Sequence, residues 1–125
     1  MQIARRAVLT ALIAAGSVPA LPAALLAADQ PLAIAMLIPG RIDDGGFMQA
    51  GYNGLVAIGD ELGAETRYID GIPPQPEAMA AALRELAAVG PDMVIAHGGQ
   101  TAPAVEIVAA EFPDVRFTVV QGALT

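Results

Sequence analysis

The sequence contains no cysteine and no lysine, and these two absences remove several classes of chemistry. Without cysteine the chain has no disulfide, no thiolate zinc site, no iron–sulfur cluster and no thiol nucleophile. Without lysine it has neither the lysine of a phosphate-binding loop nor an amine for Schiff-base catalysis. Charged residues make up only 15% of the 125 residues and hydrophobic residues 55%, which predicts a folded domain rather than a disordered tail.

Positive charge is scarce as well. Six basic residues, all arginine, stand against 13 acidic residues, and the formal net charge is −7. Proteins that bind nucleic acids present a basic surface that neutralises phosphates, so we expect no nucleic-acid partner. The single histidine cannot hold a metal ion by itself, and we expect neither a metal nor a cofactor.

The first 28 residues have the pattern of an export signal. Arg5 and Arg6 precede a long uncharged stretch whose most apolar part, residues 7–15, has the length of a signal-peptide core. A glycine and two prolines then interrupt the helix, which argues against the alternative of a membrane anchor. The paired arginines also fit the twin-arginine export pattern. We therefore expect a periplasmic protein whose signal peptide has been cleaved.

Residues 29–125 alternate apolar runs with segments of helical periodicity. The apolar runs predict strands at 32–38, 64–70, 93–96 and 115–120. Apolar spacing of three and four residues predicts helices at 46–62, 79–89 and 101–111, with Gly63 as a stop and a proline-rich loop at 73–76. This alternation predicts a doubly wound parallel α/β sheet. In such sheets ligands bind beyond the carboxyl ends of the strands, where the strand order reverses.

The loop after the first predicted strand contains Asp43, Asp44 and Phe47. Carboxylates accept hydrogens from hydroxyl and amino groups, and a phenyl ring stacks on a flat heterocycle. These three residues are therefore candidates for ligand contact, and the glycines at 45 and 46 allow the backbone to approach a ligand closely. The structural alternative is that one aspartate caps the following helix and that Phe47 packs locally.

The loop after the third predicted strand contains His97, Gly98, Gln100 and Thr101. Its backbone amides lie just before a helix N-terminus, which suits a hydroxyl group or an anion. The first three of these residues are candidates for the opposite rim of a ligand site. The alternative for His97 is a structural role at the end of the strand, and Thr101 is expected to be the helix N-cap.

Three other functions of α/β proteins fit the sequence less well. A phosphoacceptor receiver domain needs an aspartate at the end of the third strand and a later lysine, and the sequence has neither. A dinucleotide-binding fold needs a Gly-x-Gly-x-x-Gly motif after a strand, and none follows one here. A secreted hydrolase needs a nucleophile, but the one serine, Ser17, lies in the predicted signal. We therefore expect no enzymatic activity.

Three stretches of the sequence resemble one protein family in the same order. Residues 39–55 (PGRIDDGGFMQAGYNGL) resemble the opening motif of the basic membrane protein (BMP, PnrA-like) substrate-binding proteins, and residues 92–99 (DMVIAHGG) and 111–117 (EFPDVRF) resemble later motifs. The resemblance covers nearly all of residues 29–125. It implies a fold like that of type I periplasmic binding proteins, in which two α/β lobes close on a ligand, often a purine nucleoside.

The resemblance also implies roles for individual residues. Phe47 would stack on the base, Asp44 would hold polar hydrogens of the ligand, and His97 and Gly98 match the second ligand loop of the family. The sequence departs from the family pattern at four positions: Asp43 and Met48 stand where asparagine is common, Gln100 replaces a nearby aromatic residue, and Gln121 stands where an acid is frequent. These departures leave open a free base or another flat heterocycle as the ligand.

Members of this family have a second lobe and a hinge, so the resemblance implies that residues 29–125 are a partial N-terminal lobe without its C-terminal lobe. We expect a periplasmic solute-binding component of an ABC importer. Its partners would be a nucleoside or nucleobase and the permease subunits of the importer. The alternative is a ligand-sensing receptor lobe that is coupled to a membrane signalling protein.

Overall fold

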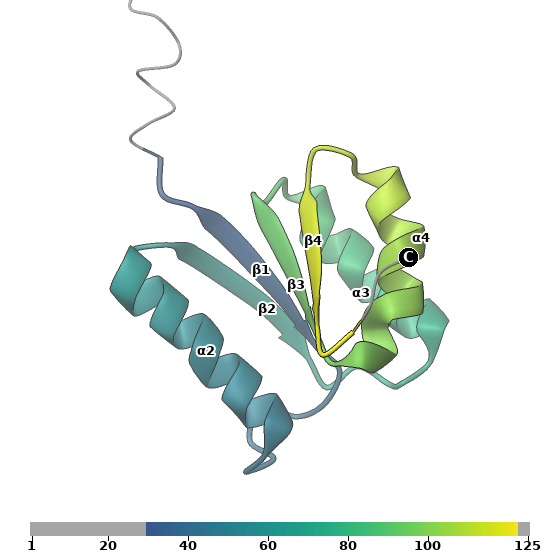
Figure 1. Cartoon of the computed structure of the whole chain (residues 1–125), viewed down its shortest axis with the longest axis horizontal. Coiled ribbons are helices and arrows are strands. Elements are labelled where there is room, and N and C mark those ends of the chain that lie inside the picture. The colour runs from purple at the N-terminus through teal and green to yellow at the C-terminus, as the bar shows by residue number, and fades with distance from the viewer. Residues whose placement is uncertain (1–29, 123–125) are drawn as a thin grey trace, which may run out of the picture. The chain divides into compact units, whose positions relative to one another are not determined.

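Strands and helices alternate along the chain as the hydrophobic pattern predicts (Figure 1). The computed structural model describes residues 30–122, and the predictions for residues 1–28 lie outside this range. The elements in chain order are β1 (Ala33–Ile38), α2 (Phe47–Leu62), β2 (Glu65–Asp70), α3 (Pro76–Ala88), β3 (Met93–His97), the 3-10 turn η1 (Gly99–Thr101), α4 (Ala102–Glu111) and β4 (Arg116–Val120).

The four strands form one parallel sheet in the order β2-β1-β3-β4. Ala35 of β1 pairs with Arg67 on one side and with Val94 on the other. The chain moves outward from β1 to β2 and then crosses back to β3, so the strand order reverses between β1 and β3. This arrangement confirms the predicted doubly wound sheet and places the reversal point in the middle of the sheet.

Helices cover both faces of the sheet, with α2 on one side and α3 and α4 on the other (Figure 1). Alternate residues of β1 therefore face different helices. Ala35 and Leu37 lie in the larger core cluster with α3 and α4, whereas Met36 and Ile38 lie in a smaller cluster with Leu55 of α2. The burial of β1 on both faces explains why its sequence is a continuous apolar run.

The helix boundaries confirm one predicted signal and correct another. Gly63 ends α2 in the left-handed conformation, at φ 65°, and its N–H donates to the carbonyl oxygen of Gly59. The assignment of Pro76 to a loop was wrong, because Pro76 occupies the first turn of α3, where its missing N–H costs no helical hydrogen bond. Val89, which the periodicity put on the apolar face of this helix, lies just past its end and is 57% exposed.

An ion pair joins the two helices on the larger core. The guanidinium of Arg84 in α3 donates to both carboxylate oxygens of Glu111 at the end of α4, at 2.7 and 2.6 Å. This bond lowers the pKa of Glu111. Within residues 30–122, no helix has the length and apolar character needed to cross a membrane.

Candidate ligand-binding site

The predicted site residues come together at the carboxyl edge of the sheet. The strands end at the edge where α2 begins (Figure 1), and the loops after β1 and β3 leave the sheet on the two sides of the reversal point. The loop after β1 is also tied to the end of β2, because the Gly71 N–H donates to the Gly40 carbonyl oxygen at 2.8 Å. Neighbouring strand ends therefore hold the first candidate loop in place.

Asp44 caps the N-terminus of α2. Its Oδ1 accepts the N–H groups of Gly46 at 2.7 Å and Gln49 at 3.0 Å, and its Oδ2 accepts that of Met48 at 3.2 Å. These hydrogen bonds lower the pKa of Asp44 and keep its carboxylate ionised at neutral pH, and the bond from the Gln49 N–H has the largest effect. The structural alternative considered for this residue is thus confirmed. A carboxylate has about four acceptor positions, and three of them are used here.

Asp43 points to a different partner in the same loop. Its two carboxylate oxygens accept hydrogen bonds from Nε and Nη2 of Arg41, at 2.8 and 2.7 Å, and both side chains are well exposed. The bond to Arg41 lowers the pKa of Asp43. Asp43 makes no capping contact with α2, and its acceptor positions face an arginine instead. The two adjacent aspartates therefore have different roles in the loop.

Phe47 and His97, which are 50 residues apart in the sequence, are stacked on each other. Their ring centroids lie 4.0 Å apart with 21° between the ring planes. The Nε2–H of His97 donates to the Phe47 carbonyl oxygen at 2.8 Å, which assigns the proton to Nε2. Phe47 is 39% exposed, whereas His97 is only 5% exposed. The prediction that both belong to one site is consistent with this contact, but direct contact between His97 and a ligand stays a prediction.

The space for the His97 ring comes from a glycine that the sequence analysis did not single out. A Cβ atom at Gly51 would lie 2.7 Å from three ring atoms of His97, closer than real Cβ contacts. Gly51 follows Phe47 by one helical turn, so both positions lie on the same side of α2. A glycine one turn after a candidate aromatic was the signal that could have pointed to this close approach.

The second loop is shaped by Gly98. Its φ of 107° strongly favours glycine, and a Cβ atom there would overlap the side-chain amide of Gln100. The Gly98 carbonyl oxygen accepts the Thr101 hydroxyl at 2.7 Å. Thr101 precedes α4 as predicted, but its side chain makes no capping bond to that helix, so the expected cap was wrong in this respect. Gln100 is exposed at the rim of the loop.

Two further features of this edge escaped the sequence analysis. Asp70, the last residue of β2, accepts the Ile42 N–H at 3.4 Å and adds a third carboxylate near the first loop. Gly99 lies against the end of β4, where a Cβ atom would be 2.6 Å from the carbonyl oxygen of Gln121. Gln121 itself has a φ of 59°. The packing of strand ends, which the sequence does not display, creates both features.

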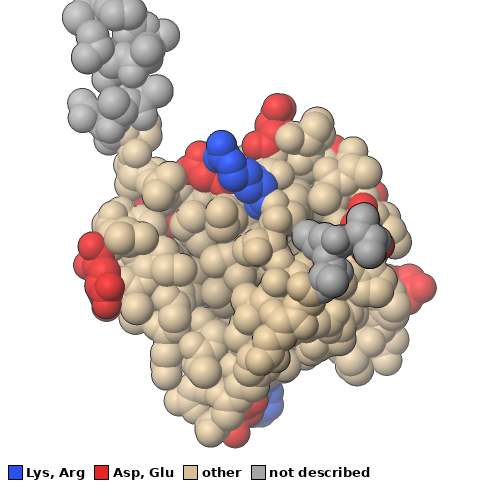
Figure 2. Space-filling model, viewed as in Figure 1, with Lys and Arg blue, Asp and Glu red and all other residues tan. Residues whose placement is uncertain are grey.

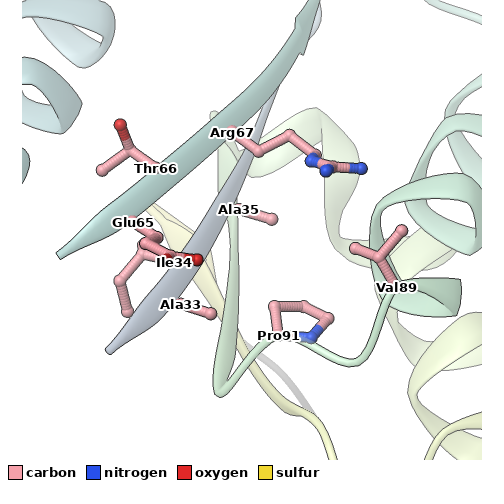
Figure 3. A pocket seen from close by; sticks show the side chains of 8 residues that line it. All are labelled: Ala33, Ile34, Ala35, Glu65, Thr66, Arg67, Val89 and Pro91. Atoms are coloured by element: carbon pink, nitrogen blue, oxygen red, sulfur yellow. The ribbon is translucent and has the colours of Figure 1, made fainter. Parts of the chain in front are cut away.

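Two pockets in the described residues lie away from this edge. One is lined by the first residues of β1 and β2 and by the chain after α3, and Figure 3 shows Arg67 and Ala35 extending toward the side where Val89 and Pro91 lie. Another lies between the ends of α3 and α4. Neither contains a predicted site residue. In residues 30–122 no group of three or more acidic or histidine side chains is placed to hold a metal ion.

Comparison with known proteins identifies the family. The family model described as "ABC transporter substrate-binding protein PnrA-like" matches residues 32–125, which is most of the chain. The chain belongs to this family. The PnrA-like match starts at the beginning of β1 and includes both candidate loops. Among curated proteins, none is similar enough to count as a match.

Three solved structures share the fold over about a quarter to a third of their own length. An ABC transporter solute-binding protein from Conexibacter woesei DSM 14684 is 29% identical with a TM-score of 0.63, over 69% of this chain and 28% of that one. An ABC transporter solute-binding protein from Aeropyrum pernix K1 is 21% identical with a TM-score of 0.65, over 75% of this chain and 25% of that one. A transcriptional activator of the comK gene from Bacillus halodurans is 20% identical with a TM-score of 0.61, over 75% of this chain and 31% of that one. The last two, below 25% identity, show the fold alone.

Proposed function

We propose that the chain is the N-terminal ligand-binding part of an exported receptor for an ABC importer, and that its ligand is a purine nucleoside or a related nucleobase. The observation that carries the proposal is the partly exposed ring of Phe47, which is stacked on His97 at the start of the helix that the ionised carboxylate of Asp44 caps. Such a ring offers a stacking surface for a flat heterocycle, and the carboxylate accepts its polar hydrogens.

The hydrogen bonds in the first loop favour a ligand that donates rather than accepts. Asp44 uses three of its acceptor positions for backbone N–H groups at the start of α2, one of them in the residue before the helix, so about one remains for a ligand N–H or O–H. Asp43 would contact a ligand only by sharing its oxygens with Arg41. Gly98 and Gln100 would complete the opposite rim with a backbone N–H and an amide. An anionic ligand would meet the carboxylates of this loop and is disfavoured.

The exposure of most candidate residues is what one half of a clamshell would show. His97 and Gly98 are buried, but the other four, Asp43, Asp44, Phe47 and Gln100, are exposed, whereas small-molecule sites bury most of the ligand surface. The chain spans 28% of the length of its solved relative from Conexibacter woesei, which is described as a solute-binding protein. We infer that a second lobe supplies the remaining contacts, and that the closed pair is recognised by the permease subunits.

Equilibrium dialysis of the purified chain tests the ligand class. The probes are adenosine, guanosine and adenine, with ribose as the control that lacks a heterocycle. Base stacking on an aromatic residue contributes about 1–3 kcal/mol, so Phe47→Ala should weaken binding of adenosine about 5- to 150-fold, while Phe47→Tyr should retain most of it. Equal affinity of the Ala variant and the wild type would contradict the stacking role, and binding of ribose without binding of any of the three heterocyclic probes would contradict the ligand class.

The alternative of a sensing lobe has no specific observation in its favour. The likeness to the comK activator, at 20% identity, shows the fold and nothing of the function. Figure 2 shows that the face seen in Figure 1 is mostly uncharged, with acidic groups at separate places around it.

A further inference from the structure

We propose that His97 is a positioning residue of the ligand site: its imidazole supports one face of the Phe47 ring, so that only the opposite face is presented to a flat ligand. The inference rests on the proposed function for the identity of the ligand. The support of Phe47 itself rests on the geometry of the described residues.

Phe47 is the first residue of α2, a position at which a side chain has few helical neighbours to restrain it. His97 restrains it in two ways. The imidazole lies against the phenyl ring at 4.0 Å between centroids, and its Nε2–H holds the Phe47 backbone through the 2.8 Å bond to the carbonyl oxygen. Ring and backbone of Phe47 are thus both fixed by one buried side chain from the end of β3.

The His97 ring is itself confined. It occupies the space against α2 that Gly51 leaves free, because a Cβ atom at this position would lie 2.7 Å from its Cδ2, Cε1 and Nε2 atoms. Gly54, three residues further along the same helix, has no atom within 4 Å of its Cβ position. Glycine in a helix interior lowers the stability of the helix relative to alanine. At Gly51 this loss of stability has a steric reason, because the missing side chain leaves room for the imidazole.

The arrangement predicts a layered stack of imidazole, phenyl and ligand heterocycle. Because His97 covers the inner face of Phe47, a ligand has only the outer face to stack on, and the ring is already ordered before the ligand arrives. Ordering a side chain on binding costs affinity, and prior ordering by His97 is therefore worth about 2- to 13-fold in the dissociation constant.

The stack can be tested without any ligand, because His97 is the only histidine in the chain. Its imidazole carbon-bound protons are identified directly in an NMR spectrum of the full chain. We expect them to be shifted upfield by the Phe47 ring current, and we expect this shift to disappear in Phe47→Leu, which keeps an apolar side chain but no ring. Imidazole signals that are unchanged in Phe47→Leu would overturn the proposal.

Two glycine variants in the same helix provide a matched pair. Gly51→Ala places a methyl group against the imidazole, and Gly54→Ala makes the same chemical change in open space. We expect Gly51→Ala to shift the imidazole signals and to weaken adenosine binding about 2- to 13-fold, whereas Gly54→Ala changes neither. Two variants with the same spectrum and the same affinity would overturn the steric argument.

Replacing His97 separates support by the ring from the hydrogen bond. His97→Phe keeps a ring under Phe47 without the N–H donor, and His97→Gln keeps a donor without the ring. We expect His97→Phe to retain more adenosine affinity than His97→Gln, with circular dichroism confirming that both fold. A folded His97→Gln variant with wild-type affinity would overturn the positioning role.

The two proposals fail in different ways. If the wild-type chain binds ribose but none of the nucleoside or base probes, the proposed ligand class fails. The NMR comparisons of Phe47→Leu and of the two glycine variants still decide whether His97 supports Phe47.

Discussion

Replacing Leu55 by alanine tests how α2, the helix that carries Phe47, is held on the sheet. Leu55 is 2% exposed and is the only large apolar side chain of α2 that is fully buried. It packs on Ile34, Met36 and Ile38 of β1 in the smaller of the two core clusters. The other helices share a cluster of 13 buried residues with the sheet. Met48, Tyr52 and Ile58 of α2 are partly buried against the same cluster, and Leu55 is the fully buried member of this contact.

The expected magnitude follows from this burial. Leu55→Ala removes three buried carbon atoms and leaves a cavity, which costs about 2–5 kcal/mol in the free energy of unfolding. A domain of this size has about 5–15 kcal/mol in total. Because α2 packs on the smaller cluster and the other helices on the larger one, we expect the loss to be concentrated in α2, so that α2 opens locally before the rest of the domain unfolds.

Native-state hydrogen exchange measures this effect residue by residue. Leu83→Ala is the control, since Leu83 is fully buried in the larger cluster under α3 and undergoes the same chemical change. We expect Leu55→Ala to speed exchange of the α2 amides far more than those of β3 and α4. Leu83→Ala should lower protection across the whole domain. Equal loss of protection in α2 and α4 in the Leu55→Ala variant would refute the reasoning.

Three further predictions concern single features of the chain. The pKa of Asp44 is lowered in the folded state, mainly by the Gln49 N–H. Its ionised form therefore contributes stability above the unfolded pKa of about 4, and this stability is lost as the pH falls through the lower folded pKa. Asp44→Asn should flatten the dependence of melting temperature on pH below about pH 4. Gly99→Ala should lower the melting temperature, since its Cβ atom would lie 2.6 Å from the Gln121 carbonyl oxygen, and an unchanged value in calorimetry would contradict that contact. Expression with export should yield a periplasmic product that lacks about the first 28 residues by intact mass, and a full-length mass would contradict the signal-peptide prediction.

The fold was accessible from the sequence because its signals are local. β1 is a continuous apolar run, and a strand with this composition is buried on both faces. Gly63 marks the end of α2 through its left-handed conformation. The alternation of strands and helices leaves few topologies, and the loops at the reversal point follow from the topology. Pro76 was misassigned because proline is compatible both with a loop and with the first turn of a helix.

The site was accessible only in outline, because its contacts join distant parts of the chain. The motif around Phe47 and the loop at His97 were recognised separately, but nothing local in either predicts that the two rings stack. The burial of His97 depends on the missing side chain of Gly51, which is a fact of packing. Asp43 and Asp44 are adjacent and chemically identical, and only the three-dimensional structure tells which one caps the helix.

These contacts join the two layers of the domain at the point where a ligand would bind. Phe47 begins α2, and Asp44 caps the start of this helix from the preceding loop, whereas His97 ends β3, which is paired on both sides within the sheet. The stack and the Nε2–H bond therefore anchor the start of α2 to an inner strand of the sheet. A ligand stacked on Phe47 would be supported through His97 by the sheet. The precision of the site would then come from β3, although the groups that touch the ligand lie mainly in the loop before α2 and in its first turn.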